Sequence, residues 1–387
     1  MRAGLDLNAT RVVGVLGAAV GGMSPKPVTL AEGDTELPLI ISLAGRRPEV
    51  GRAGLERCRL APHEVCALFL PEVNDPPGQR IWAHGRHRLN ASQAMLLVLE
   101  RLREELGGIE ALTVALPPYL QPKQAVALAR LAEQARLPWL GSVSSPLALA
   151  LAAHASDPWA GPAVIVDVDE HALSWSLVSA NEERQLLLLV HSVSCSQAGL
   201  RRWRERMIDA IAERCIQLSR RDPRVIGEAE QQLWLQLDAA LGSAAGEGER
   251  HLTIQVDGWY QVVPFEAKYF TPWRDALIKA SLKGLNTLLG DAATHDPPRV
   301  VVLTSSVARL PGLREALRDH MAEGTTFLEL SPRAAAQAAH QFADRFRSGK
   351  LPFGHIDSFT DWPVPQPHVE SRFQAATGRL RILGLSP

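Results

Sequence analysis

Two stretches of the sequence share one plan, in which a strand runs into a polar turn and a second strand returns. The first covers residues 5–16 and breaks at Asn8-Ala9-Thr10, and the second covers residues 163–178. Backbone N–H groups at the tip of such a β-turn-β unit can face one anion together. Asp6 and Asp167 stand close to the two turns, where carboxylate oxygens can hold a hydrated magnesium ion. The repeated plan therefore predicts two hairpins that hold a nucleotide from both sides of a cleft.

The composition allows a large buried core and excludes several classes of protein. Apolar residues make up 46% of the 387 positions, which excludes global disorder. The 41 Lys and Arg residues are balanced by 42 Asp and Glu residues, and this balance excludes the basic footprint of a general nucleic-acid binder. Four cysteines are too few for a disulfide scaffold. They form no Cys-x-x-Cys pair, so no zinc site is expected.

The sequence predicts no membrane span. The longest purely aliphatic run, residues 186–190, is much shorter than the roughly 18–20 residues that cross a bilayer. The N-terminal stretch is similar to a signal peptide, but Asp6, Asn8 and Arg11 interrupt it, and a strand, a turn and a second strand fit it better. We expect a cytoplasmic protein with reduced thiols and no membrane partner.

Periodicity and turn residues predict an alternation of strands and helices. The helix over residues 91–106 is expected to have Ser92 as its N-cap. The other predicted helices cover residues 121–135, 146–154, 199–219, 227–241, 271–289, 313–321 and 331–345. Predicted strands outside the two repeated units cover residues 37–43, 112–116, 139–143, 186–193, 251–256, 260–263 and 300–303.

Several segments, in one order, resemble the actin-like ATPases and above all the DnaK-type heat-shock chaperones. Residues 4–10 look like the first phosphate loop of that family, and residues 164–169 look like the strand into its second phosphate loop. Residues 301–311 resemble its adenosine motif. Further matches at the family's spacing are residues 113–119, 124–137, 144–153 and 331–339. The resemblance runs from residue 4 to about residue 345.

This resemblance implies an α/β chain with the actin-like two-lobed ATPase fold, in which duplicated ribonuclease-H-like lobes surround a central cleft. The first lobe is expected over residues 1–158, with a loop-rich insertion at about 30–90. The second is expected over residues 159–346, with a helix-hairpin insertion at about 199–290. Residues 347–387 are expected to form a Pro-rich linker and a C-terminal tail. No counterpart of the chaperones' peptide-binding domain is expected.

The resemblance also implies a set of site residues and a cofactor, ATP or ADP with magnesium. Asp6 and Asp167 are expected to hold the metal through water and to act in catalysis. The positions implied for phosphate and adenosine binding are Asn8, Ala9, Thr10, Asp169, Glu170, Ser305, Ser306 and Arg309.

The phosphate loops depart from the family pattern. Asn8 and Ala9 replace the family's Gly and its phosphate-contacting Thr, and Asp169-Glu170-His171-Ala172 replaces its Gly-Gly-Gly-Thr. Two carboxylates would then face a polyphosphate, and each close pair of like charges disfavours binding by about 1 kcal/mol in a wet site.

Other positions with a role in the family are also changed. Residues 67–72 lack the family's catalytic Lys, and Ser145 stands where the family has a Glu near magnesium. Ser305 and Ser306 replace a Gly-Gly pair and would crowd the base and ribose. Residues 234–240 lack the charged adenine contacts. These losses favour weak or absent catalysis.

Three functions follow from this pattern. The first is a heat-shock-chaperone-like pseudo-ATPase that acts as a protein-interaction module. The second is an active chaperone-like ATPase that binds magnesium-ATP. The third, a sugar- or acetate-kinase-like phosphotransferase, needs a general base, for which Asp169 or Glu170 could serve.

Three segments are candidates for contacts with other molecules. The basic residues 201–206 could bind an acidic partner or form a solvated helix face with Trp203 and Ile208 turned inward. Residues 84–88, His-Gly-Arg-His-Arg, could bind an anion or form a solvated loop. Residues 348–369 read as a linker, and residues 379–385 as a short strand or docking peptide that packs on this chain or on a protein partner of unknown identity.

Overall fold

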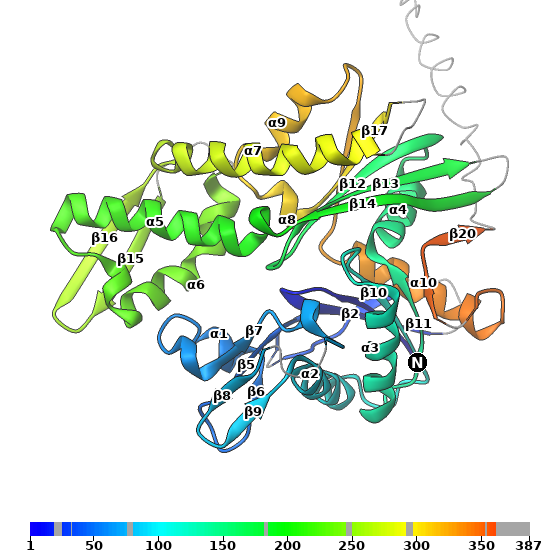
Figure 1. Ribbon diagram of the computed structural model, residues 1–387, viewed down its shortest axis with the longest axis horizontal. Coiled ribbons are helices and arrows are strands. Elements are labelled where there is room, and N and C mark those ends of the chain that lie inside the picture. The colour runs from blue at the N-terminus through cyan, green and yellow to red at the C-terminus, as the bar shows by residue number, and fades with distance from the viewer. Residues whose placement is uncertain are drawn as a thin grey trace, which may run out of the picture.

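The computed structural model describes residues 1–360 except 19–24, 32, 76–79, 182–184, 245–249, 292–296 and 353. The chain is a mixed α/β protein with several sheets. Two large sheets form the body of the molecule, and each carries helices (Figure 1). The possible docking peptide at residues 379–385 lies outside the described residues.

The first large sheet has the strand order β19-β11-β10-β1-β2-β3, with β4 also paired to β2. Its central strand β1 is antiparallel to β2 and parallel to β10, which is parallel to β11. The strands are β1 (Arg2–Leu7), β2 (Arg11–Gly17), β3 (Lys26–Pro27), β4 (Glu36–Pro38), β10 (Ala111–Leu116), β11 (Trp139–Ser144) and β19 (His355–Ile356).

The second large sheet repeats this arrangement, with the order β18-β17-β12-β13-β14-β20. Its central strand β12 is antiparallel to β13 and parallel to β17, which is parallel to β18. The strands are β12 (Gly161–Val168), β13 (Leu173–Asn181), β14 (Leu186–Cys195), β17 (Val300–Thr304), β18 (Thr326–Leu330) and β20 (Ser358–Thr360). In both sheets a tight hairpin therefore leads from the end of the central strand.

Two helices join the sheets, α4 (Ser145–Ser156) and α10 (Ala334–Arg347). They pack against each other. Helix α10 lies on β1 and β10, and α4 contacts the second sheet, so one apolar core spans both units. The fit is close at Gly4 in β1, where an added Cβ would lie 2.3 Å from the Ala336 carbonyl oxygen. Helix α10, although it follows the second sheet in the chain, thus packs on the first sheet.

Each unit carries an insertion on the same side of the molecule (Figure 1). The first insertion contains β5 (Ile40–Ser42), β6 (Glu49–Val50), α1 (Arg52–Leu55), η1 (Pro62–Glu64), β7 (Val65–Ala67), η2 (Leu70–Glu72), β8 (Trp82–His84) and β9 (His87–Leu89). The second contains η3 (Ser196–Ala198), α5 (Leu200–Ser219), η4 (Pro223–Val225), α6 (Gly227–Ala244), β15 (Arg250–Val256), β16 (Trp259–Phe265) and α7 (Ala267–Asp291). The other helices are α2 (Ala91–Leu106), α3 (Pro122–Gln134), α8 (Ser305–Ala308) and α9 (Leu313–His320).

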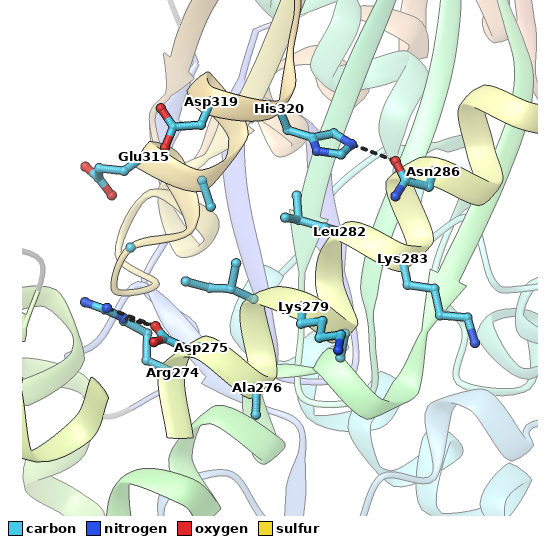
Figure 2. Close-up of a pocket in the computed structure, with 14 residues that line it drawn as sticks. Arg274, Asp275, Ala276, Lys279, Leu282, Lys283, Asn286, Glu315, Asp319 and His320 are labelled. Atoms are coloured by element: carbon cyan, nitrogen blue, oxygen red, sulfur yellow. Dashed lines mark hydrogen bonds and ion pairs between the residues drawn. The ribbon is translucent and has the colours of Figure 1, made fainter. Parts of the chain in front are cut away.

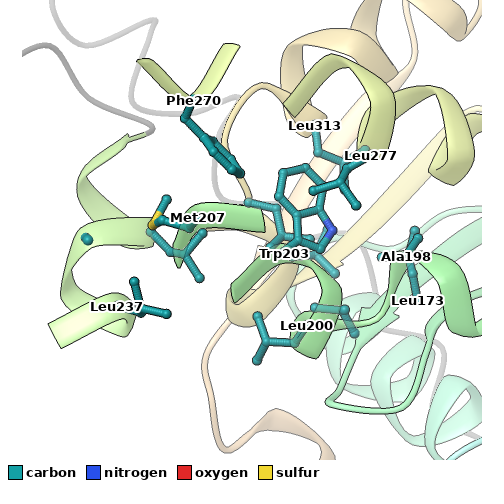
Figure 3. Close-up of a cluster of buried hydrophobic side chains, with 14 of the residues drawn as sticks. Leu173, Ala198, Leu200, Trp203, Met207, Leu237, Phe270, Leu277 and Leu313 are labelled. Atoms are coloured by element: carbon teal, nitrogen blue, oxygen red, sulfur yellow. The ribbon is translucent and has the colours of Figure 1, made fainter. Parts of the chain in front are cut away.

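The basic helix α5 is built into the core of the second unit. Trp203 is fully buried, its ring centroid lies 6.3 Å from that of Phe270, and Leu277 and Met207 pack around it (Figure 3). Ile208 is also buried. The predicted inward face is therefore confirmed.

Two local predictions differ from the structure. Helix α2 has the predicted bounds, but its N-cap is Asn90 rather than Ser92. Asn90 Oδ1 accepts from Gln93 N at 2.8 Å, and Gln93 Oε1 accepts from Asn90 N at 3.0 Å, which is a capping box.

The second difference lies in the segment predicted as a linker. Strand β19 pairs with β11 in the first sheet, and β20 pairs with β14 in the second. Residues 355–360 therefore tie the two sheets together instead of forming a loose connection.

No helix among the described residues is both long and apolar enough to cross a membrane.

Candidate functional site

The tips of the two repeated hairpins touch each other. The Ala9 amide donates to Asp169 Oδ2 at 2.9 Å, and the Glu170 amide donates to Thr10 Oγ1 at 2.8 Å. The partners are 160 residues apart in the chain. The structure thus brings the predicted loop residues together, but as direct partners across the two units.

Each tip is also closed on itself by one side chain. In the first hairpin, Asn8 Oδ1 accepts from the amides of Thr10 at 3.0 Å and Arg11 at 3.1 Å. In the second, Asp169 Oδ1 accepts from the amides of His171 and Ala172, each at 2.9 Å. Asn and Asp side chains favour such turns because they bond the backbone two or three residues ahead.

Asp169 collects four donors. Besides the three amides, its Oδ2 accepts from the Tyr119 hydroxyl at 2.5 Å. The residue is only 4% exposed. Burial and the neighbouring Asp169 charge hold the pKa of Tyr119 well above its usual range, so the phenol stays a donor. A carboxylate held by converging backbone amides occupies the kind of site that binds an anion.

Glu170 is neutralised by Arg204. The Arg204 guanidinium forms ion pairs with Glu170 and, at 2.6 Å, with Asp238 of α6. Arg204 is buried, in contrast to its exposed neighbours Arg201 and Arg202. Protein donors therefore already bind both of the carboxylates that were expected to face a polyphosphate.

Asp6 and Asp167 line one small cavity of about 20 Å³. Asp167 Oδ1 accepts from the Val168 amide and the Thr304 hydroxyl, both at 2.9 Å. Asp6 Oδ2 accepts from Asn8 Nδ2 at 3.4 Å. The cavity has room for about one water molecule.

Both of these acids hold their protons more tightly than usual. Burial, with the Asp167 charge nearby, raises the pKa of Asp6 to about 7. Burial, with the Asp169 charge nearby, raises the pKa of Asp167 to about 6, against the hydrogen bond from Thr304. The carboxyl groups of Asp6 and Asp167 are thus expected to lose their protons near neutral pH.

The residues predicted for adenosine divide between two places. Ser305 and Ser306 begin α8 and line the same small cavity as Asp6 and Asp167. Arg309 is exposed, and its Nε donates to the Ser305 carbonyl oxygen at 3.3 Å. The two serines therefore fill space close to the acids, and Arg309 is turned back onto its own helix.

A second cavity of about 490 Å³ lies between the two insertions and is bordered by Thr10 and Glu170. The insertions are also bonded directly through Gln231 of α6, whose Oε1 accepts from the amides of Arg59 at 2.8 Å and Leu60 at 3.2 Å. The Arg59 guanidinium lies 3.8 Å from the centroid of the Trp234 ring. The two units are therefore joined at the insertions as well as at the hairpin tips.

A larger hollow, of about 1140 Å³, lies elsewhere, between α7 and α9 (Figure 2). Lys279 and Lys283 face it from α7, and Glu315 and Asp319 from α9. His320 and Asn286 close one end through a contact of 2.6 Å between His320 Nε2 and Asn286 Oδ1. None of the residues predicted to bind nucleotide lines this groove.

Sequence reasoning missed Tyr119 and Arg204 as partners of the second tip. Tyr119 follows β10, which runs parallel to β1, and the carboxyl ends of parallel strands share one sheet edge. That position could have placed the phenol near the hairpins, but nothing local distinguishes Arg204 from the arginines beside it. No family model matches the chain, and no curated protein matches it.

Proposed function

We propose that the chain has the actin-like two-lobed fold and is a pseudo-ATPase whose phosphate site is filled by its own Asp169. The repeated strand order supports the fold, since both sheets place a hairpin after the central strand and two parallel strands beside it. The protein then acts as an interaction module of fixed shape, without nucleotide turnover.

The observation that carries this proposal is the set of four donors on Asp169. A phosphate between the tips needs the amides that this carboxylate already occupies. Hydrogen bonds to a charged group contribute about 1.5–3 kcal/mol each. If opening the tips costs about 3 kcal/mol, the apparent affinity for nucleotide falls roughly a hundredfold.

A triphosphate with magnesium does not fit the tips as they stand. Asp6 and Asp167 have the chemistry to hold a hydrated magnesium ion, but the cavity between them measures about 20 Å³. The tips also bond to each other directly. No catalytic step is therefore assigned to these residues.

Interaction with a protein partner is supported by the exposed apolar side chains of the second insertion. Val225 is 79% exposed and Tyr260 is 68% exposed, although both belong to ordered elements. In the basic segment 201–206, Glu205 pairs with Arg201 and Arg202. Arg204 pairs with Glu170 and Asp238, and Arg206 pairs with Asp209. Four acids thus balance the four arginines of the segment, which leaves little net charge to attract an acidic partner.

Calorimetric titration of magnesium-ATP and magnesium-ADP into the purified chain tests the proposal. We expect no binding tighter than about 100 µM, equivalent to about −5.5 kcal/mol. Asp169→Ala should bind more tightly than the unmodified chain if the carboxylate is what blocks the amides. Asn8→Ala, which removes the equivalent turn side chain of the other hairpin, is the matched control. Tight binding by the unmodified chain would contradict the proposal.

The second candidate is an active magnesium-dependent ATPase, favoured by the convergence of Asp6 and Asp167 on one cavity. It predicts measurable hydrolysis that Asp167→Asn abolishes while the fold is retained. The phosphotransferase hypothesis is less supported, because Asp169 and Glu170 are engaged by protein donors and neither is free to act as a base.

A further inference from the structure

Three potential metal ligands meet in the first insertion. His63 and Glu64 belong to η1, and His84 ends β8. One ligand atom from each lies within 4.8 Å of the other two. No other group of three or more His, Cys, Asp or Glu side chains with this spacing occurs among residues that the structure describes. Two segments 20 residues apart therefore deliver two imidazoles and a carboxylate to one point.

The spacing of these atoms suits a metal ion better than a direct hydrogen bond. His84 Nε2 lies 3.6 Å from Glu64 Oε1, and His63 Nε2 lies 3.9 Å from the same oxygen. A tetrahedral zinc ion holds nitrogen and oxygen ligands at about 2.0–2.2 Å, which places the ligands about 3.4 Å from each other. Both Glu64–imidazole distances exceed this value by only a few tenths of an ångström, and the two imidazole ligand atoms lie within 4.8 Å of each other.

Glu64 is already oriented for this role. Arg57 Nε donates to Glu64 Oε2 at 2.8 Å, which leaves Oε1 for the two imidazoles. The Glu64 carbonyl oxygen accepts from the Leu43 amide at 2.7 Å, which fixes its backbone. The Arg57 hydrogen bond also keeps the pKa of Glu64 below its usual range, so the ligand is ionised. Carboxylates that bind metals are commonly oriented by such a partner.

The other polar side chains of the His84 loop are used differently. Arg86 donates to the Arg46 carbonyl oxygen, and His87 Nε2 lies 3.0 Å from the Gly45 carbonyl oxygen. The loop therefore packs on the backbone of residues 45–46, and His84 alone of these residues approaches Glu64. No zinc site is expected from the sequence because the cysteines form no Cys-x-x-Cys pair, but this group consists of two imidazoles and a carboxylate.

We propose that His63, Glu64 and His84 bind a zinc ion, with water as the fourth ligand, and that the ion fastens η1 to the β8–β9 hairpin. Two imidazoles and one carboxylate suit zinc and its transition-metal neighbours, whereas magnesium and calcium prefer oxygen ligands alone. The side chain of Glu64 is 16% exposed and that of His63 is 72% exposed, so the ion can enter from solvent. The site does not depend on whether the cleft binds nucleotide.

Titration of zinc into the full-length protein, freed of metal with a chelator, tests the proposal at pH 7.5. We expect one ion per chain with a Kd near or below 10 µM, and a rise in Tm when zinc is added. His84→Ala should weaken binding at least about thirtyfold and abolish the rise in Tm. His87→Ala, in the same hairpin but bonded to a backbone carbonyl, is the matched control and should change the Kd by less than about twofold. Millimolar magnesium should not compete.

Cobalt gives a second readout, because its visible absorption reports imidazole and carboxylate coordination. His63→Ala is expected to fold normally, since this side chain is exposed, and it should alter the cobalt spectrum. The proposal is overturned if the unmodified chain binds zinc no more tightly than about 100 µM. It is equally overturned if His84→Ala and His63→Ala bind zinc as His87→Ala does, which would assign the ion to other residues.

Discussion

The two hairpins follow the central strands of sheets with the same strand order, yet their turns are closed by different chemistry. Asn8 closes the first tip with a neutral amide that serves its own turn and the nearby Asp6. Asp169 closes the second with a carboxylate that serves its own turn and the opposite unit. Asn has an NH₂ group where Asp has a second carboxylate oxygen. That second oxygen lets Asp169 accept from the opposite unit, whereas Asn8 closes only its own turn and bonds to the nearby Asp6.

The two tips differ in whether a side chain of the protein itself accepts from the outward-pointing amides. A neutral Asn side chain leaves the amide of Ala9 free to point outward, and the charged Asp169 accepts that amide. Charged acceptors make stronger hydrogen bonds than neutral ones. Under the proposed function, the second tip supplies the negative charge that a bound nucleotide would otherwise bring.

The largest effect is expected from removing Asp169. Asp169→Ala leaves three amides and the Tyr119 hydroxyl without their acceptor, and we expect the free energy of unfolding to fall by about 3 kcal/mol. Asn8→Ala affects mainly its own turn and should cost about 1 kcal/mol. Urea unfolding of both variants measures the difference. Equal losses in the free energy of unfolding would show that Asn8 and Asp169 stabilise the fold to the same extent.

Asp169→Asn separates the two roles of this side chain. Its remaining oxygen can still accept from His171 and Ala172, but its NH₂ group cannot accept from Ala9. We expect a loss between those of the two alanine variants, together with faster proteolysis between the units. If Asp169→Asn lowers the free energy of unfolding as much as Asp169→Ala, the charge and the second carboxylate oxygen account for the whole effect of this side chain.

The next effect is a pH dependence that distinguishes the acids of the two hairpins. The folded state keeps a proton on Asp6 up to about pH 7, whereas an unfolded Asp releases it near pH 4. The folded state therefore binds more protons in this window, and the free energy of unfolding falls as pH rises from about 4 to 7. Asp6→Asn should flatten this fall by about 2–4 kcal/mol and should be the more stable form at pH 8.

Urea unfolding at pH 5, 6, 7 and 8 provides this measurement. Burial lowers the pKa of His340 and adds a slope of opposite sign, but His340 is present in both proteins and cancels in the difference. Asp167→Asn should flatten the fall less than Asp6→Asn, because the pKa of Asp167 is only about 6. Identical slopes in the unmodified chain and Asp6→Asn would contradict the assignment.

The smallest effect is expected at Thr10. Thr10→Val keeps the shape of the side chain but removes the acceptor of the Glu170 amide. One neutral hydrogen bond contributes about 1 kcal/mol, so the free energy of unfolding should fall by about that amount. Thr10→Ser retains the hydroxyl and is the control. A Thr10→Val variant as stable as the unmodified chain would mean that water replaces this contact between the tips.

Much of the local structure could be predicted from the sequence. The predicted helices over 91–106 and 199–219 correspond to α2 and α5. The predicted strands over 251–256 and 260–263 correspond to β15 and β16, which form a hairpin. These elements depend on spacing and turn residues within a few positions of each other. The error at Ser92 has the same local scale, because the capping box begins at Asn90, two residues earlier.

The candidate site could be predicted only as a set of residues. The sequence by itself determined two acidic hairpins without phosphate-loop glycines, and it placed Asp6 and Asp167 at their strand ends. Tertiary structure alone decided that Asp169 accepts from Ala9 and Tyr119, and that His84 meets Glu64. The physical reason is the separation along the chain between the residues that interact. A turn is set by neighbours in the chain, whereas the acceptor of a distant amide is chosen by how two sheets and their insertions pack.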